Sequence, residues 1–366
     1  MPHFLFLIAP LLFSFLATFC VMPWLLRLCQ RRGLYDQPDA RKVHTARIPR
    51  LGGLLFAPSI LVAMGGGTLV LQLIFPQQEA ITIRFSTVVI MTGLLINYLV
   101  GILDDIFGVR ASVKFIVQLL TSLLFPLCGL YINDLHGLFG IGAIPIWIGY
   151  PLTVFACLLI VNAYNLIDGI DGLSSSLGIM ALAVFGILFW QLQVVAYTFL
   201  AVSLIGSILA FLYFNLWGSV ERGTKTFMGD TGSLVLGYTL AYLAFKYAMD
   251  NPTVLSYRPE AFSTALSLVA VPIFDLIRVA VARWRRGVGI FTPDRTHLHH
   301  LCLDAGFSMR QSLLLILLLQ GIIIVGSCLA LHRTPLHPTW VLLSSILLFA
   351  LFVGWLKMRQ KRRTVQ

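Results

Sequence analysis

Long apolar runs separated by short polar connections make up most of the chain. Each run is long enough to cross a membrane as a helix. They cover residues 4–26, 52–75, 85–103, 113–132, 150–166, 173–192, 194–217, 233–249, 262–281, 312–331 and 340–356. The sequence shows neither an internal repeat nor a segment long enough for a separate soluble domain. The pattern predicts an all-α polytopic membrane protein with about eleven transmembrane helices, and residues 1–366 forming a single integral-membrane domain.

The amino-acid composition also indicates a membrane protein. The 366 residues are 58% hydrophobic and only 11% charged, whereas soluble domains carry about 25% charged residues. The first apolar run is not preceded by the basic region of a signal peptide, so we expect it to remain as the first helix. The six cysteines are scattered without a Cys-x-x-Cys pair, which suggests neither a disulfide framework nor a zinc knuckle.

Basic residues indicate how the chain is oriented. Of the 26 lysines and arginines, 22 fall in the connections on one side of the predicted bundle and in the carboxyl-terminal tail. Basic connections stay in the cytoplasm, so the amino terminus is predicted outside and the carboxyl terminus in the cytoplasm. Much of the net charge of +11 follows from this topology, and contact with anionic lipid headgroups is a second ordinary cause.

A polar stretch, 162–173, follows directly on the fifth apolar run. It contains the amides Asn162 and Asn165 and the carboxylates Asp168 and Asp171. Such polar groups in a membrane protein are costly unless they have partners or lie at a wet boundary, so a functional site is the favoured interpretation. The alternative is a simple turn, because Asn, Asp and Gly are common turn residues.

Three more carboxylates fall at the same predicted depth. Asp104 and Asp105 close the third apolar run, and Asp230 precedes the eighth. Five carboxylates at one cytoplasmic boundary would repel each other unless a cation intervened, and oxygen ligands favour magnesium or manganese over zinc. Asp230 alone could be a helix N-cap. The stretch 229–233 around it is rich in glycine and opens a helix, which suits a phosphate.

Residues 293–300 form a histidine-rich connection. Arg295, His297, His299 and His300 are a set suited to a sugar phosphate. The alternative is a zinc site, in which His297 and His300 share one helix face near Cys302. The nearby carboxylates and the arginine inside the cluster favour the sugar phosphate.

Two features stay open at this stage. Asp275 lies inside the ninth apolar run and is either a structural ion pair with Arg278 or a site residue. The basic connection 37–53 by itself indicates only a cytoplasmic location.

Taken together, the motifs resemble those of a known family. In order, the chain carries Pro38-Asp39-x-Arg41-Lys42, Asp104-Asp105, Asn162-Ala-x-Asn165-x-x-Asp168-Gly-x-Asp171-Gly-Leu173, Phe227-Met-Gly-Asp230-x-Gly-Ser233 and His297-x-His299-His300. They resemble the polyprenyl-phosphate N-acetylhexosamine-1-phosphate transferases, the superfamily of WecA, TagO and MraY. The MraY branch has a lysine three positions after the aspartate pair and three consecutive histidines. Gly108 and Leu298 stand at those points, so the chain looks like the WecA type.

The resemblance implies a reaction and its participants. N-acetylhexosamine 1-phosphate, as GlcNAc-1-phosphate in the WecA type, would pass from a UDP-sugar to undecaprenyl phosphate, releasing UMP. The lipid product would start a cell-envelope glycan such as O-antigen, common antigen or teichoic acid. The expected partners are the UDP-sugar, undecaprenyl phosphate, the lipid bilayer and a second copy of the chain in a homodimer, with no nucleic acid. The expected location is the bacterial cytoplasmic (inner) membrane, with the site facing the cytoplasm.

The resemblance also implies roles for particular residues. Asp230 would bind Mg²⁺, with Mn²⁺ as a substitute, and Asp104 or Asp105 would deprotonate or orient the acceptor phosphate. Asp168 and Asp171 would support the metal and the nucleotide. The substrate-binding residues would be Asn165 and Phe227 near the nucleoside, and Arg295, His297, His299 and His300 at the pyrophosphate and sugar.

Two alternatives to this reading remain. One is the same reaction with another UDP-N-acetyl sugar. The other is a secondary transporter, whose acidic residues usually lie near the membrane midplane on broken helices within repeated halves.

Overall fold

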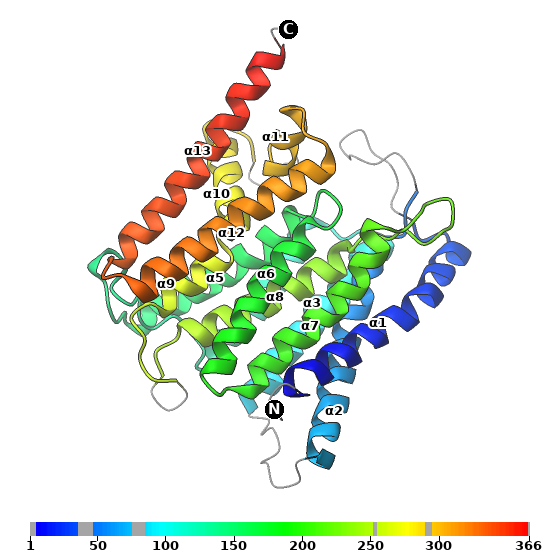
Figure 1. Cartoon of the computed structure of the whole chain (residues 1–366), viewed down its shortest axis with the longest axis horizontal. Helices are drawn as coiled ribbons and strands as arrows, with labels where there is room; N and C mark the ends of the chain where they lie inside the picture. Colours follow the sequence, from blue (N-terminus) through cyan, green and yellow to red (C-terminus); the bar gives the residue numbers. More distant parts are fainter. Residues whose placement is uncertain (1–4, 36–46, 75–84, 252–254, 290–294, 365–366) are drawn as a thin grey trace.

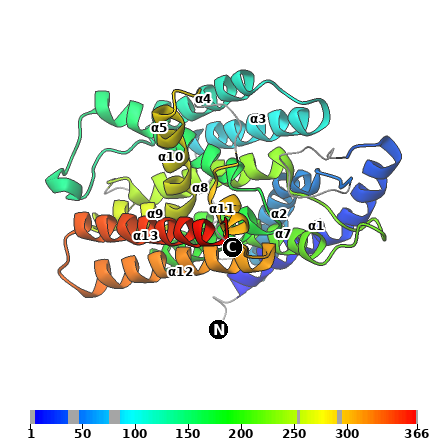
Figure 2. The ribbon, with the colours of Figure 1, turned by 90° about the horizontal axis from the view of Figure 1, so that it is seen from above.

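The structure, a computed structural model, describes residues 5–35, 47–74, 85–251, 255–289 and 295–364, and these are almost entirely helical (Figures 1 and 2). The helices are α1 (Leu5–Arg32), η2 (Gly52–Leu55), α2 (Phe56–Ile74), α3 (Phe85–Phe107), α4 (Ala111–Leu127), η3 (Leu138–Gly140), α5 (Ile146–Leu166), α6 (Leu173–Gln191), α7 (Val195–Leu216), α8 (Gly229–Ala248), α9 (Ala261–Leu268), α10 (Ala270–Arg285), α11 (Leu298–Asp304), α12 (Met309–Arg333) and α13 (Pro338–Thr364).

Every apolar run predicted to span the membrane coincides with a helix or with the pair α9 and α10. Among the described residues, eight helices are long and apolar enough to cross a membrane, and the bent pair makes a ninth. The helix α4 is apolar but shorter, with 17 residues. The predicted all-α polytopic membrane fold is therefore confirmed, whereas eleven crossings and the orientation of the termini stay predictions.

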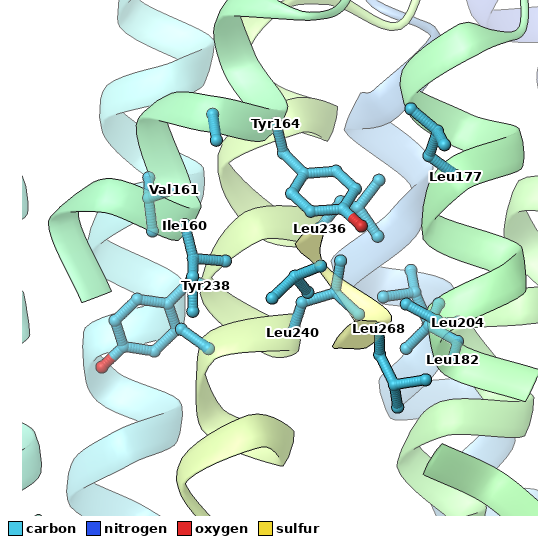
Figure 3. Packing of buried hydrophobic residues seen from close by; sticks show 14 of the residues in the cluster. Ile160, Val161, Tyr164, Leu177, Leu182, Leu204, Leu236, Tyr238, Leu240 and Leu268 are labelled. Atoms are coloured by element: carbon cyan, nitrogen blue, oxygen red, sulfur yellow. The ribbon is translucent and has the colours of Figure 1, made fainter. Parts of the chain in front are cut away.

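The helix α8 lies at the centre of the bundle (Figure 1). It packs against α3, α5, α6 and α9, and its residues from Thr231 to Phe245 are all buried. Burial on every side places this helix inside the bundle rather than at its surface. Figure 3 shows Leu236 and Leu240 of this helix among side chains from neighbouring helices, including Val161 and Tyr164 of α5.

Glycines let α8 approach two neighbours at backbone distance. A Cβ atom on Gly101 of α3 would lie 2.5 Å from the Thr231 Cα, and one on Gly237 of α8 would lie 2.8 Å from the Val161 Cα. Membrane helices use small residues in this way because close backbone contact replaces the hydrophobic effect. The contact at Gly101 brings the first turn of α8 against the last turns of α3, where the aspartate pair lies.

A second group of helices, α9 to α13, packs on this central bundle (Figures 1 and 2). The axes of α9 and α10 differ by 73°. α12 and α13 contact each other, and both contact the short helix α11. α1 begins at one end of the bundle and α13 ends beyond the other (Figure 1). The histidines predicted to bind the donor lie at the start of α11, at the end of the bundle where α13 finishes.

Candidate functional site

The carboxylate of Asp105 joins the end of α3 to the start of α8. It accepts hydrogen bonds from the Asp230 backbone N–H (2.9 Å), the Thr231 backbone N–H (2.9 Å) and the Thr231 hydroxyl (2.6 Å). These amides belong to the first turn of α8. The N–H groups of a first turn have no partners within their own helix and carry partial positive charge. We expected this helix start to suit a phosphate, but the protein's own carboxylate occupies these two amides.

Gly229 makes this contact sterically feasible. Its φ of +72° lies in the left-handed region, and a Cβ atom there would lie 2.6 Å from Asp105 Oδ2 and 2.0 Å from the Arg50 carbonyl oxygen. Glycine is the residue that adopts this backbone conformation without strain. The glycines of the 229–233 stretch therefore serve contact between protein segments.

The segment that precedes α2 ties the same region together. Arg50 donates from Nε to the Asp105 carbonyl (2.7 Å) and from Nη2 to the Asp104 carbonyl (2.9 Å), at the end of α3. Cations at a helix end that exposes carbonyls are favourable. The Phe227 backbone N–H donates to the Pro49 carbonyl (2.8 Å). The motif part 38–42 of this connection lies outside the described residues.

Lys114 of α4 lies between two of the predicted site aspartates. Its Nζ donates to Asp104 Oδ2 (3.0 Å) and to Asp230 Oδ2. The other oxygen of Asp230 accepts from Asn165 Nδ2 (2.9 Å). The N-cap of α8 is Met228, and Asp230 lies inside the first turn of the helix, so the structure does not support the N-cap alternative. The structure thus brings three of the five predicted carboxylates, Asp104, Asp105 and Asp230, together, with Asn165 beside Asp230.

Asp168 and Asp171 have opposite surroundings despite their close spacing. Asp171 accepts from Lys225 Nζ (2.6 Å) and from Asn215 Nδ2 (3.3 Å). No described residue donates a hydrogen bond to Asp168, which is partly buried. Burial, and then the negative charges of Asp230 and Asp171, raise the pKa of Asp168 well above its usual range. Asp168 is therefore a carboxylate that lacks a cationic partner among the described residues.

Asp275, left open by the sequence, is both an ion-pair partner and a support for the site. Its buried carboxylate accepts from Arg278 Nη2 (2.6 Å) and from the Leu298 backbone N–H (3.2 Å), and it pairs with His297 Nδ1 (2.9 Å). A carboxylate at Nδ1 holds the proton on that nitrogen and leaves Nε2 facing away. Asp275 thus fixes both the orientation and the tautomer of His297.

His299 links the histidine cluster to the 162–173 stretch. A Cβ atom on Gly169 would lie only 2.1 Å from His299 Nε2, so the imidazole rests directly on that glycine. The side chain is buried, and its Nδ1 has no hydrogen-bond partner in the described part of the chain. Burial and the neighbouring His300, whose ring centroid is 4.2 Å away, lower the pKa of His299 to about 3. The imidazole is therefore neutral at physiological pH.

The remaining predicted residues differ in accessibility. His297 and His300 are buried at the start of α11, whereas Arg295 is exposed before them. Phe227 is half-buried, and its backbone pairs with the 47–53 segment. Of the described residues, no three His, Cys, Asp or Glu side chains are arranged to hold a metal ion. A magnesium site needs only one or two carboxylates, because water and substrate phosphates complete its octahedron.

Sequence reasoning missed the cations of the site. Lys114, Lys225 and Arg50 were counted only as topology signals, yet each contacts an aspartate or its backbone. One local signal was available for Lys114. It lies four residues before Gln118 on the same face of α4, and Gln118 accepts a hydrogen bond from Asn162 (2.7 Å).

Comparison with known proteins gives concordant matches. The sequence pattern of the family described as glycosyl transferase family 4 matches residues 87–248. The chain is similar to the undecaprenyl-phosphate alpha-N-acetylglucosaminyl 1-phosphate transferase of Yersinia pestis, with 33% identity over 325 residues, 88% of this chain and 84% of the relative. It is 30% identical to the protein of the same name from Escherichia coli O157:H7 over 343 residues, 93% of this chain and 88% of the relative.

The contrast between the two aspartates of the 162–173 stretch gives a stability test. Asp168→Asn removes a repelled charge, so the substrate-free protein should melt at a higher temperature than wild type at neutral pH. The pKa of Asp168 is higher in the folded protein than in the unfolded chain, which fixes the sign of the pH dependence. The Asp168 charge begins to destabilise the folded protein above the usual carboxyl pKa, and this destabilisation grows as pH rises toward the folded-state pKa. The gain in melting temperature should therefore shrink as pH falls toward 4.

Asp171→Asn is the matched control. It removes the partner of the partly buried Lys225 ammonium, so the melting temperature should fall. Thermal unfolding of the detergent-solubilised variants measures both effects. Equal destabilisation by the two substitutions would show that Asp168 has a stabilising partner and would contradict the assignment.

Proposed function

The chain belongs to glycosyl transferase family 4, and from that membership we propose that it transfers N-acetylglucosamine 1-phosphate from UDP-N-acetylglucosamine to undecaprenyl phosphate. The observation that carries the proposal is the similarity, over most of both chains, to relatives whose names state this acceptor and this sugar phosphate. The products are undecaprenyl-diphospho-N-acetylglucosamine, which begins a cell-envelope glycan, and UMP.

The reaction joins two anions. An oxygen of the lipid phosphate forms a bond to the sugar-linked phosphorus of the donor. The bond from that phosphorus to the oxygen bridging the two donor phosphates breaks, and the oxygen leaves with UMP. Since the acceptor is already a phosphate monoester, no protein nucleophile is required. The protein must instead offset the repulsion between the two substrates and orient the attacking oxygen.

Accessibility divides the proposed roles of the aspartate pair. The Asp105 side chain is 2% exposed and its oxygens are taken by α8, so it positions Asp230. The Asp104 side chain is 13% exposed and shares Lys114 with Asp230. Asp104 is thus the better candidate to orient or deprotonate the acceptor phosphate, with the Lys114 ammonium beside it to attract that phosphate.

Magnesium is the cofactor we propose, held by Asp230 with support from Asp168. The fit rests on the unpartnered Asp168 carboxylate, whose raised pKa reflects burial and repulsion from Asp230, and on the preference of Mg²⁺ for one or two carboxylates plus phosphate oxygens. When bound, the ion supplies positive charge at the donor phosphates. Asn165 fixes the rotamer of Asp230 through a hydrogen bond to its Oδ1.

The histidine cluster completes the proposed donor site. His299 stays neutral, so it contributes hydrogen bonds rather than charge, and its buried Nδ1 has no partner in the described structure. Arg295, exposed at the start of the cluster, adds a cation for the pyrophosphate. The proposal sets this site at the cytoplasmic face of a bacterial inner membrane, which is supported by the location of 22 of the 26 basic residues.

The function is tested with purified protein in detergent, undecaprenyl phosphate and a panel of UDP-sugars. UMP should appear only when the lipid phosphate is present, and N-acetylglucosamine 1-phosphate should move to the lipid in preference to the other sugars. A transporter would release no UMP without a membrane gradient. A stoichiometric burst of UMP without lipid, with phosphate retained on the protein, would contradict direct transfer.

The metal is tested separately by chelation. Excess EDTA should abolish UMP release, and Mg²⁺ or Mn²⁺ should restore it, whereas Ca²⁺ should not because its coordination is looser. Asp230→Asn should keep the melting temperature close to wild type while lowering turnover by about a hundredfold or more at any magnesium concentration. Full activity in EDTA, or one equivalent of zinc in untagged protein, would overturn the magnesium assignment.

A further inference from the structure

The chain between α9 and α10 breaks inside the membrane domain, and a glutamine from another helix fills the break. Gln320 of α12 is fully buried. Its Nε2 donates to the carbonyls of Ser267 (2.9 Å) and Leu268 (3.1 Å), and its Oε1 accepts from the Val271 backbone N–H (2.9 Å). The side-chain amide therefore meets three backbone groups from both sides of the break.

In an uninterrupted helix, two of these three backbone groups would pair with each other and the third would have no partner. In a continuous helix the Val271 N–H would donate to the Ser267 carbonyl four residues earlier. The Leu268 carbonyl would face Pro272, which has no N–H. Gln320 inserts its amide between Ser267 and Val271 and also satisfies Leu268. The 73° bend is thus stabilised from outside by one side chain.

The direction in which α10 leaves the break determines where the histidines lie. α10 carries Asp275, one turn beyond the break, and Asp275 holds His297 and the Leu298 amide at the start of α11. α11 in turn places His299 on Gly169. The opposite end of α11 is held by α13, where Arg359 Nε donates to the Ala305 carbonyl (3.1 Å).

We propose that Gln320 is a positioning residue for the donor site, acting through the broken helix and Asp275 on the histidine cluster. The inference rests on the proposed transfer of a sugar phosphate and adds a residue that lies outside every motif. Since α13 also holds α11, losing the bridge tilts the cluster without releasing it. The effect falls on binding of the UDP-sugar, because the acceptor aspartates are held by α3, α4 and α8.

The test uses Gln320→Met, which keeps the approximate volume and removes all three hydrogen bonds. We expect kcat/KM for UDP-N-acetylglucosamine to fall about tenfold or more, since small misplacement of binding groups has effects of this size. KM for undecaprenyl phosphate should stay at the wild-type value. Calorimetric binding of the UDP-sugar should weaken by a similar factor, which measures the effect independently of turnover.

Two variants serve as comparisons. Gln320→Glu keeps the acceptor for Val271 and, because a buried carboxyl is protonated, one donor, so its donor affinity should lie between those of wild type and Gln320→Met. Ser327→Ala removes another buried polar group of α12, whose hydroxyl pairs with Ser345 of α13 and makes no hydrogen bond to the described residues of α9 or α10, so this variant should bind donor as wild type does. Gln320→Glu also decides the question if Gln320→Met fails to fold.

The double variant Gln320→Met with Asp275→Asn tests the path. If both residues act through His297, the fold-loss of donor affinity in the double variant should be smaller than the product of the fold-losses in the two single variants. Wild-type donor affinity in the Gln320 variants, or equal losses for donor and acceptor, would overturn the positioning role. Absence of UMP release by the wild-type protein would instead contradict the proposed function, so the two failures are distinguishable.

Discussion

The carboxylate of Asp105 at the start of α8 is the contact on which the arrangement of the site depends. It satisfies two backbone amides that have no partner within their own helix. Thr231 is fully buried, so its amide has no water as an alternative partner, and the contact between α3 and α8 is favoured. Gly101 and Gly229 leave the space for it. Once this contact is made, Asp230 lies beside the aspartate pair.

Most, but not all, of the carboxylates around this contact between α3 and α8 have a cationic partner. Asp104 and Asp230 share Lys114, Asp171 has Lys225 and Asp275 has Arg278. Asp168 is the exception, with no donor in the described structure. Burying a carboxylate without a partner is unfavourable, so its retention at the centre of the site fits a ligand position for a cation that arrives with the substrate. Functional sites commonly retain such local instability.

Local pattern predicts local structure well in this chain and long-range partners poorly. The apolar runs predict each helix that crosses the bundle, and the shared depth of Asp105, Asp168 and Asp230 predicts that these carboxylates lie near one another. The partner of Asp230 could not be read in this way, because Lys114 lies 116 residues away. The pattern at 229–233 indicated a helix start but not that a protein carboxylate would occupy it. The bridge at Gln320 depends on a bend that apolar composition does not reveal.

In the proposed reaction a phosphorus atom, and not only a sugar, moves to the lipid. Donor labelled with ³²P at either phosphate tests it most directly, with the chromatographed lipid and nucleotide counted separately. Label on the sugar-linked phosphate should enter the lipid diphosphate, while label on the nucleoside-linked phosphate should stay in UMP. Recovery of both labels in UDP would mean that the enzyme transfers the sugar alone, and would contradict the account.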